Sequence, residues 1–242
     1  MQDNNILPTD LFGQALLDYV NGDYSGDITT YISLDEEDLL SLPYLFRSFD
    51  EMPALEQRAL QLSVGKVLDV GCGAGSHSLY LQKKGMDITA LDVSPGAVAT
   101  CKKRGLKNVI LTDFYDFSGM KFDTILLLMH GIGMAGNIEN LDAFLEHLIS
   151  LLNPGGQVLL DSSDIIYMFD QDKDGGYWVP GDVAYYGEVQ FIVEYKEVKS
   201  ASFPWLYLDY NTLEAVATEK DLTCQLVSSG EHNDYLARLS IG

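Results

Sequence analysis

Residues 67–78 read VLDVGCGAGSHS, an apolar strand pattern that ends in an acid and runs into a glycine-rich turn before a helix. Gly71, Gly73 and Gly75 supply the turn. Glycine has no Cβ, so it allows a tight turn and lets a ligand lie directly against the main chain. The stretch therefore predicts a close ligand contact between a strand and a helix. A tight turn without any ligand is the alternative.

The spacing of these glycines differs from the dinucleotide-binding fingerprint. That fingerprint reads Gly-X-Gly-X-X-Gly, whereas the third glycine here comes one residue earlier. Dinucleotide folds seat a pyrophosphate on the helix N-terminus. The earlier glycine favours a ligand without a pyrophosphate, and it counts against a nicotinamide-dependent oxidoreductase.

Further apolar runs surround this motif and alternate with segments of helical spacing. The runs are KVLDV (66–70), DITALDV (87–93), NVILTD (108–113), FDTILLLM (122–129) and QVLLD (157–161). Strands that alternate with helices pair in parallel through right-handed crossovers. We therefore predict an α/β, Rossmann-like fold with helices on both faces of a mostly parallel sheet.

The flanking segments divide one domain of residues 1–242 into four predicted parts. Apolar residues at helical spacing in 12–19 and 52–62 predict a helical N-terminal cap over residues 1–62, followed by a ligand-binding core over 63–164. Residues 165–208 carry an extended run at 188–198 with a partner at 201–208, so we expect an antiparallel β insertion that forms a lid. Residues 209–242 predict a closing helix and two strands, which bring the sheet to seven strands.

Net charge limits the classes of partner. The chain has 15 Lys and Arg against 36 Asp and Glu, a formal net charge of −21. Affinity for nucleic acid rests on cations that neutralise phosphates, so we expect no nucleic-acid partner. An acidic surface is tolerant of cationic ligands, and it also favours solubility.

The sequence also lacks membrane and metal signals. No apolar run approaches the roughly 18 residues that span a bilayer, and MQDNNILPTD (1–10) lacks the basic and apolar regions of a signal peptide. We expect a cytoplasmic protein with no membrane partner. Cys72, Cys101 and Cys224 are widely spaced, which predicts reduced thiols. No His and carboxylate cluster has convincing ligand spacing, so no metal is expected.

Two strand ends beyond the glycine turn carry residues that suit a nucleoside. Asp92 lies about twenty residues after the turn, where an acid can accept hydrogen bonds from both ribose hydroxyls. A cap for the helix that begins near Ser94 and Pro95 is the alternative. Asp113 offers an acceptor for an adenine amino group and Phe114 offers an aromatic face. A buried loop aromatic is the alternative for Phe114.

Together these motifs resemble class I S-adenosylmethionine-dependent methyltransferases over residues 66–161, including an Asn-Pro-Gly-Gly turn at 153–156. The resemblance implies the cofactor S-adenosylmethionine, with S-adenosylhomocysteine as product. The residues that it implies for cofactor binding are Asp69, Gly71, Cys72 and Gly73 at the methionine end, Asp92 and Val93 at the ribose, Asp113 and Phe114 at the adenine, and Met129 beside the methyl group. The chain also resembles bacterial members of this family whose cap carries YLFRSFDEMP and whose insertion carries YYGE, a resemblance that names no acceptor.

The fourth run ends where the methyl group would lie, so His130 is the candidate catalytic residue. It would act as a general base for a hydroxyl or a protonated amine, or it would simply bond the loop backbone. The sequence Met-His-Gly-Ile at 129–132 differs from the Asn or Asp, Pro-Pro, aromatic pattern of enzymes that methylate amino groups in nucleic acids.

Other residues have two interpretations each. Arg47 would reach the cofactor carboxylate or form an ion pair, and Asp161, Ser162 and Ser163 would orient an acceptor or cap the next helix. The residues that would line an acceptor pocket or pack in the fold are Trp178, Glu188, Tyr195, Trp205 and Tyr207.

The leading hypothesis is a methyltransferase of a small-molecule acceptor, because a helical cap and a β insertion suit closure over a modest ligand. A protein methyltransferase is the alternative within the same chemistry. A protein that binds S-adenosylmethionine without transferring the methyl group is a third hypothesis, and the oxidoreductase is a fourth. The oligomeric state has no signal in the sequence.

Overall fold

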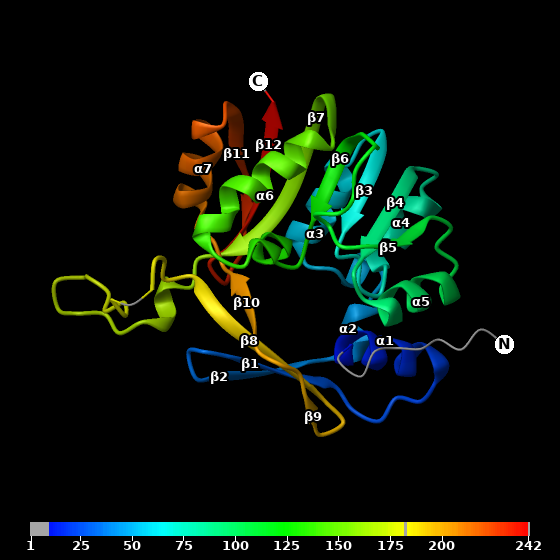
Figure 1. The fold of residues 1–242 in the computed structure, drawn as a ribbon, viewed down its shortest axis with the longest axis horizontal. Coiled ribbons are helices and arrows are strands. Elements are labelled where there is room, and N and C mark those ends of the chain that lie inside the picture. Colours follow the sequence, from blue (N-terminus) through cyan, green and yellow to red (C-terminus); the bar gives the residue numbers. More distant parts are fainter. Residues whose placement is uncertain (1–9, 182, 242) are drawn as a thin grey trace.

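A seven-stranded sheet forms the core of the computed structural model, which describes residues 10–181 and 183–241 (Figure 1). The strands lie in the order β11-β12-β7-β6-β3-β4-β5. Their bounds are β3 Lys66–Val70, β4 Asp87–Asp92, β5 Val109–Leu111, β6 Phe122–Leu127, β7 Leu152–Ser163, β11 Leu222–Ser229 and β12 Asp234–Ile241. Strands β3 to β7 pair in parallel, whereas β12 is antiparallel to both β7 and β11. The predicted α/β fold with a mostly parallel seven-stranded sheet is confirmed.

Helices cover both faces of this sheet, because alternate strand residues point to opposite sides. Ile125 and Leu127 of β6 pack with α6 and α7 in one apolar core, and Leu126 packs with α3, α4 and α5 in the other. The bounds of these helices are α3 Ala54–Leu62, α4 Ser76–Lys83, α5 Pro95–Lys103, α6 Ile138–Ser150 and α7 Tyr210–Glu219. A strand that is buried on both faces needs an almost continuous apolar sequence, which β6 has.

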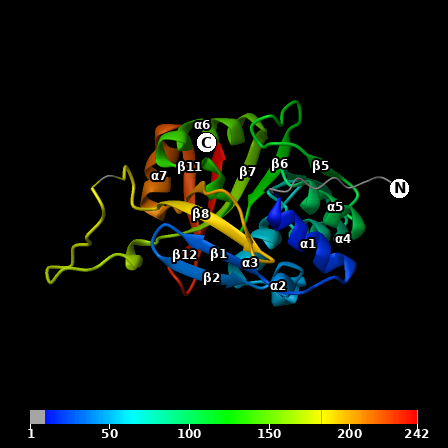
Figure 2. The ribbon, with the colours of Figure 1, turned by 60° about the horizontal axis from the view of Figure 1, so that its bottom comes forward.

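A second, antiparallel sheet lies across the carboxyl ends of the parallel strands (Figures 1 and 2). Its order is β10-β8-β1-β2, with β9 paired to β8. The bounds are β1 Ile28–Ile32, β2 Glu36–Leu40, β8 Glu188–Tyr195, β9 Val198–Lys199 and β10 Phe203–Leu206. We call this sheet the roof. The β insertion is where the sequence predicts it.

The cap differs from its prediction. It contains α1 (Leu11–Asn21), α2 (Leu42–Leu45), the 3-10 helix η1 (Phe49–Glu51) and α3, but the hairpin β1–β2 interrupts these helices. The hairpin was not predicted, because β2 is EEDLL, with four exposed residues and no alternating apolar face. It becomes a strand through pairing: β1 binds β8, so that Thr30 lies opposite Val193 in the insertion. Cap and insertion therefore form one sheet.

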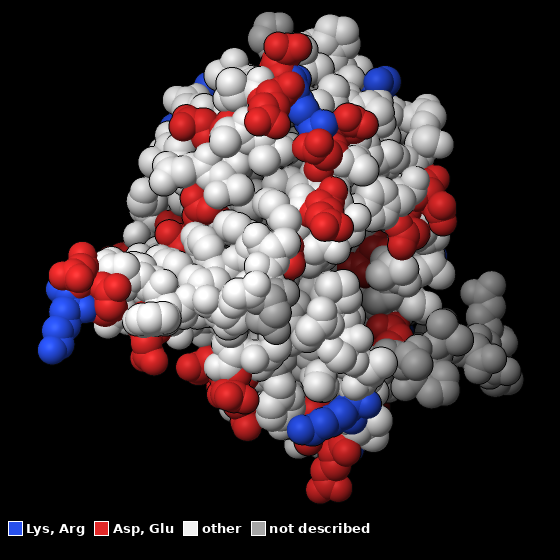
Figure 3. All heavy atoms as spheres, turned by 60° about the vertical axis from the view of Figure 1, so that its left-hand side comes forward, with Lys and Arg blue, Asp and Glu red and all other residues white. Residues whose placement is uncertain are grey.

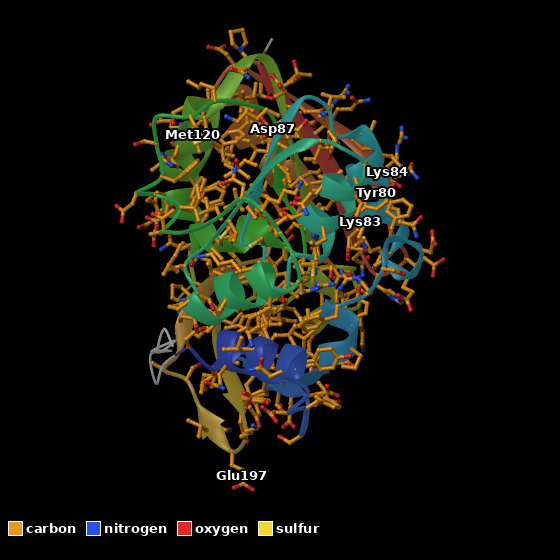
Figure 4. All side chains as sticks on the ribbon, turned by 90° about the vertical axis from the view of Figure 1, so that its right-hand side faces the viewer. Tyr80, Lys83, Lys84, Asp87, Met120 and Glu197 are labelled. Carbon is orange, nitrogen blue, oxygen red and sulfur yellow. The ribbon has the colours of Figure 1, made fainter. Side chains whose placement is uncertain are left out.

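Helix α1 joins the cap to the core by packing on α5, as Figures 1 and 4 show. Asp10 accepts hydrogen bonds from Ser94 Oγ and from the backbone N–H of Gly96, each at 2.9 Å, and it also caps α1 through the N–H of Gly13. A Cβ on Gly96 would lie 2.3 Å from the carbonyl carbon of Gly13, so the two helices meet backbone to backbone. This contact places the cap beside the end of β4.

The start of β7 and the segment 169–181 both differ from what the sequence predicts or were not predicted from it. Strand β7 starts at Leu152, so the Asn-Pro-Gly-Gly turn lies within the strand's bounds instead of before it. The segment 169–181 projects from the body as an arm, with the side chain of Trp178 72% exposed (Figure 1). The prediction that no signal peptide is present concerns residues 1–10, of which 1–9 lie outside the described residues. Within 10–181 and 183–241, no helix has both the length and the apolar character needed to cross a membrane.

Candidate active site

The glycine turn after β3 has the backbone conformation that its sequence requires. Gly71 and Gly73 have positive φ angles of 72° and 53°, and both line a large cavity. The N–H groups of Gly71 and Cys72 donate to the carbonyl of Leu91, at 2.9 and 3.1 Å, which fastens the turn to β4. Any Cβ at these glycines would need a strained left-handed conformation and would reduce the space for a ligand.

Asp92 ends β4 next to this turn. Its Oδ2 accepts a hydrogen bond from the N–H of Gly73 at 2.8 Å, and its Oδ1 accepts one from the N–H of Ser94 at 2.9 Å. The N-cap of α5 is Ser94, whose Oγ accepts from the N–H of Ala97, so Asp92 is not the helix cap. Burial raises the pKa of Asp92 to about 6. Each oxygen keeps a lone pair that could accept a hydroxyl of a ligand.

At the end of β5 the two predicted adenine residues have different surroundings. Asp113 is exposed, and its Oδ1 accepts from the N–H of Tyr115. The ring of Phe114 is only 7% exposed and packs against Phe144 and His147, so much of its surface already belongs to the core. Tyr115, which is 47% exposed, also lines the cavity and presents a more open aromatic surface.

Two consecutive residues directly after β6 have a strained backbone. Met129 and His130 both have positive φ angles, 57° and 61°, in a region that costs side chains other than glycine of order 1–3 kcal/mol each. Asp161, at the end of the neighbouring strand β7, accepts the backbone N–H of His130 at 2.9 Å and holds this turn. Asp161, Ser162 and Ser163 do not cap a helix: they remain in β7, and Ser162 Oγ accepts from the N–H of Leu208. The capping interpretation is therefore wrong.

The cap contributes a buried ion cluster to the same region. Arg47 Nη2 lies 2.5 Å from both carboxylate oxygens of Glu56, and His77 Nε2 lies 2.7 Å from Glu56 Oε2. All three side chains are buried. The pKa of Glu56 is lowered: burial opposes ionisation, but hydrogen bonds and charge from His77 and Arg47 outweigh it. Arg47 Nη2 also touches Met129 Sδ at 3.4 Å, and its buried Nε has no hydrogen-bond partner within residues 10–181 and 183–241.

One cavity of about 1100 Å³ lies between the roof and the carboxyl edge of the parallel sheet. The glycine turn, Asp92, the residues after β5 and β6, Asp161 and the Arg47–Glu56–His77 cluster all line it. Its floor is the carboxyl edge of the parallel sheet, and its cover includes side chains from β1, β2, β8 and β10. These roof residues are Thr30, Ile32, Asp38, Leu40, Phe191, Val193, Phe203 and Trp205. Open parallel sheets bind ligands where the strand order reverses, which here is between β3 and β6. The sheet topology and the cavity agree on the position of the site.

Comparison with known proteins identifies this arrangement. Residues 44–194 match a family model described as a methyltransferase domain. The chain belongs to the S-adenosylmethionine-dependent methyltransferases. A solved S-adenosylmethionine-dependent methyltransferase from Bacteroides fragilis, in complex with S-adenosyl-L-homocysteine, is 38% identical over 98% of this chain and 97% of that chain, with a TM-score of 0.88. The methyltransferase assignment excludes the oxidoreductase alternative, and the cofactor is S-adenosylmethionine.

Two curated methyltransferases are more distant. The ubiquinone biosynthesis O-methyltransferase of Xanthomonas euvesicatoria is 29% identical over 43% of this chain and 45% of its own length. The dTDP-3-amino-3,4,6-trideoxy-alpha-D-glucopyranose N,N-dimethyltransferase of Streptomyces venezuelae is 28% identical over 62% of this chain and 64% of its own length. In both cases the match spans less than two thirds of the relative.

The groups that surround the cavity fit this methyltransferase cofactor. The two left-handed glycines provide a surface without Cβ atoms, Asp92 offers oxygens to hydroxyl groups, and the orphaned Nε of Arg47 suits a carboxylate. All residues predicted for cofactor binding or catalysis line the cavity: Asp69, Gly71, Cys72, Gly73, Asp92, Val93, Asp113, Phe114, Met129 and His130. Among the described residues, no group of three or more His, Cys, Asp or Glu is arranged to hold a metal ion.

The predicted acceptor residues separate into two groups. Trp205 and Tyr207 line the cavity. Glu188 accepts the N–H of Ile138, and the buried Tyr195 donates to Asp18, so both of these serve the packing of the fold. Trp178 lies on the exposed arm, away from the cavity lining.

Sequence reasoning missed several residues of the site, two of them in the cap. Glu56 and His77 were not singled out, and neither were Tyr44 and Phe191, which line the cavity. One signal for Glu56 was available: it stands beside Leu55, Ala59 and Leu60 on the buried face of a predicted helix, where an acid needs a partner. The partners come from the loop after α2 and from α4, and only the tertiary fold brings them together.

Proposed function

We propose that this methyltransferase acts on a small molecule that enters the cavity beneath the roof. The cavity volume of about 1100 Å³ carries the proposal. Pockets for a single small ligand or cofactor typically measure about 300–1,000 Å³. The space thus accommodates the cofactor and a modest acceptor together.

In this proposal one half of the cavity binds the cofactor and the other half binds the acceptor. Asp69, Gly71, Cys72 and Gly73 hold the methionine end, Asp92 and Val93 the ribose, and Asp113 and Phe114 the adenine. The acceptor lies on the other side of the β3–β6 switch point, near Met129 and His130, where the insertion 165–208 and the hairpin β1–β2 act as its lid. A bound cofactor supplies an activated methyl group, so the chain has mainly to align the acceptor and exclude water.

The two curated relatives support a small acceptor, because their names describe a quinone pathway and a nucleotide-linked amino sugar. Strongly acidic character argues against nucleic acid. A protein acceptor is the competing candidate.

Methyl-labelled S-adenosylmethionine tests the proposal directly. An extract of the source cells is separated into molecules below about 3 kDa and proteins, and the wild-type protein is incubated with each fraction. The limit is set at this size because a pocket for a small ligand does not enclose a larger molecule. We expect label in the small-molecule fraction and none there with Asp92→Ala. Label only in the protein fraction would reject the small-molecule assignment and support the protein acceptor.

A further inference from the structure

We propose that the acceptor is an amine, held as a cation between the carboxylate of Asp161 and the aromatic side chains of the roof. This inference rests on the proposed function and names its substrate class. It comes from the charges and rings around the acceptor half of the cavity.

Acidic side chains predominate around the cavity. Eight carboxyl groups line it: Asp10, Asp38, Glu56, Asp69, Asp92, Asp113, Asp161 and Asp234. Among the described lining residues Arg47 is the one Lys or Arg, and both oxygens of Glu56 already engage it. A carboxylate or phosphate on the acceptor would meet no free lysine or arginine among the described lining residues and would face several acids, with the imidazoles of His77, His130 and His232 as the remaining basic groups. A positively charged acceptor would be attracted.

Asp161 is the acid best placed for such a cation. It is 7% exposed, its Oδ1 accepts the N–H of His130, and its Oδ2 has no hydrogen bond within the described part of the chain. Burying an ionised carboxylate is unfavourable unless an opposite charge and hydrogen bonds compensate it. Burial raises the pKa of Asp161, and the hydrogen bond from the N–H of His130 offsets this only in part. An ammonium donor would supply both the missing hydrogen bond and the missing charge.

Aromatic rings complete the acceptor half. The rings of His130 and Tyr207 lie 5.4 Å apart, and Phe191 lies 6.4 Å from Tyr207 and 6.1 Å from Trp205. Gly133 in the 3-10 helix η2 (Gly131–Ala135) permits this wall, because a Cβ there would lie 2.1 Å from the ring of Trp205. Faces of Tyr and Trp attract organic cations. Burial raises the pKa of Tyr207 to about 12, so its hydroxyl stays neutral and can donate but cannot act as the base.

The proton balance assigns a role to His130. A protonated amine has no free lone pair, so it must lose one proton before it reacts. His130 lines the cavity, and its imidazole can accept that proton and pass it to solvent. In the transfer the amine lone pair forms the new bond to the methyl carbon, the carbon–sulfur bond breaks, and its electron pair remains on sulfur. The methylated amine leaves as a cation, which Asp161 neutralises until release.

Binding of matched probes tests the inference without a known substrate. Protein saturated with S-adenosylhomocysteine is titrated calorimetrically with benzylamine, benzyl alcohol and benzoate, which share a ring and differ in charge. We expect benzylamine to bind at least about tenfold more tightly than the other two. Asp161→Asn keeps an oxygen for the N–H of His130 and removes the charge, so it should weaken benzylamine about tenfold and leave benzyl alcohol unchanged.

Asp116→Asn is the control, because it makes the same change in net charge at an exposed site outside the cavity lining. It should leave the affinity for benzylamine at the wild-type value. Benzyl alcohol or benzoate binding as tightly as benzylamine, equal loss in the two variants, or no binding of any probe would each overturn the inference. Failure of the proposed function has a different signature, since label would then appear only in protein. A labelled ether or ester in the small-molecule fraction would retain the proposed function and reject the amine.

Discussion

Asp92 is a residue at which burial and ligand binding have opposite effects on ionisation. Burial raises its pKa to about 6, whereas hydroxyl donors bind the carboxylate more strongly than the acid. At neutral pH this raised pKa means that ionised Asp92 destabilises the folded protein. Between about pH 4 and 6 the folded chain binds more protons at Asp92 than the unfolded chain does, so this residue lowers stability as the pH rises through that window. A bound cofactor should offset this loss of stability, because its hydroxyl groups would donate hydrogen bonds to the ionised carboxylate.

We therefore predict that S-adenosylhomocysteine binds up to about tenfold more tightly at pH 7 than at pH 5, because Asp92 ionises between these values. Asp92→Asn should bind more weakly at pH 7 and lack this increase. Calorimetric titration at a series of pH values measures both. Asp87→Asn is the matched control, since Asp87 is exposed at the opposite end of β4 (Figure 4). An unchanged pH dependence in Asp92→Asn would assign the titration to another group.

At the scale of elements, the contact between α1 and α5 couples the cap to the cofactor site. Gly13 and Gly96 let the helix backbones touch, and Asp10 bonds the loop that begins α5 directly after Asp92. The roof is coupled in a similar way, because β1 from the cap pairs with β8 from the insertion. Movement of α1 would therefore disturb both the ribose side of the cavity and its cover.

Gly96→Ala should destabilise the protein by about 1–3 kcal/mol, because the new methyl group would overlap the backbone of Gly13 and force the helices apart. It should also weaken S-adenosylhomocysteine binding. Urea unfolding and calorimetry measure the two effects. In Gly26→Ala the added Cβ has no atom of the described residues within 4 Å, so stability should stay the same or rise by up to about 1 kcal/mol. Equal stability of both variants would refute the tight α1–α5 contact.

At the scale of the whole molecule, acidic side chains dominate. The net charge is −21, and Figure 3 shows acidic groups spread over one face with few basic ones among them. Such self-repulsion destabilises the compact state. Salt shortens its range, because the Debye length falls from about 30 Å at 0.01 M to about 8 Å at 0.15 M.

We predict that raising NaCl from 10 to 150 mM increases the urea concentration at the unfolding midpoint and leaves the slope of the transition unchanged, in line with screening of a negative surface. Urea is the appropriate denaturant because it is uncharged. A midpoint that falls with salt would mean that attractive ion pairs, such as Lys196 with Asp18, outweigh the repulsion.

The sequence by itself determined the parallel core and the residues at its carboxyl edge. Period and turn chemistry are local properties of the chain, so they were enough to place the glycine turn, Asp92 and His130 at strand ends. The predicted set lines one cavity, while the individual roles remain proposals.

Only the tertiary structure decided what covers that edge and how its charges are paired. The β1–β2 hairpin is too polar to signal a strand and depends on β8, which lies about 160 residues further along the chain. Likewise Arg47 lies in the loop after α2, Glu56 on α3 and His77 on α4. Asp161, at the end of β7, accepts the N–H of His130, which follows the neighbouring strand β6. Long-range pairing gives these groups their burial and their partners, and a pattern of neighbouring residues does not contain that information.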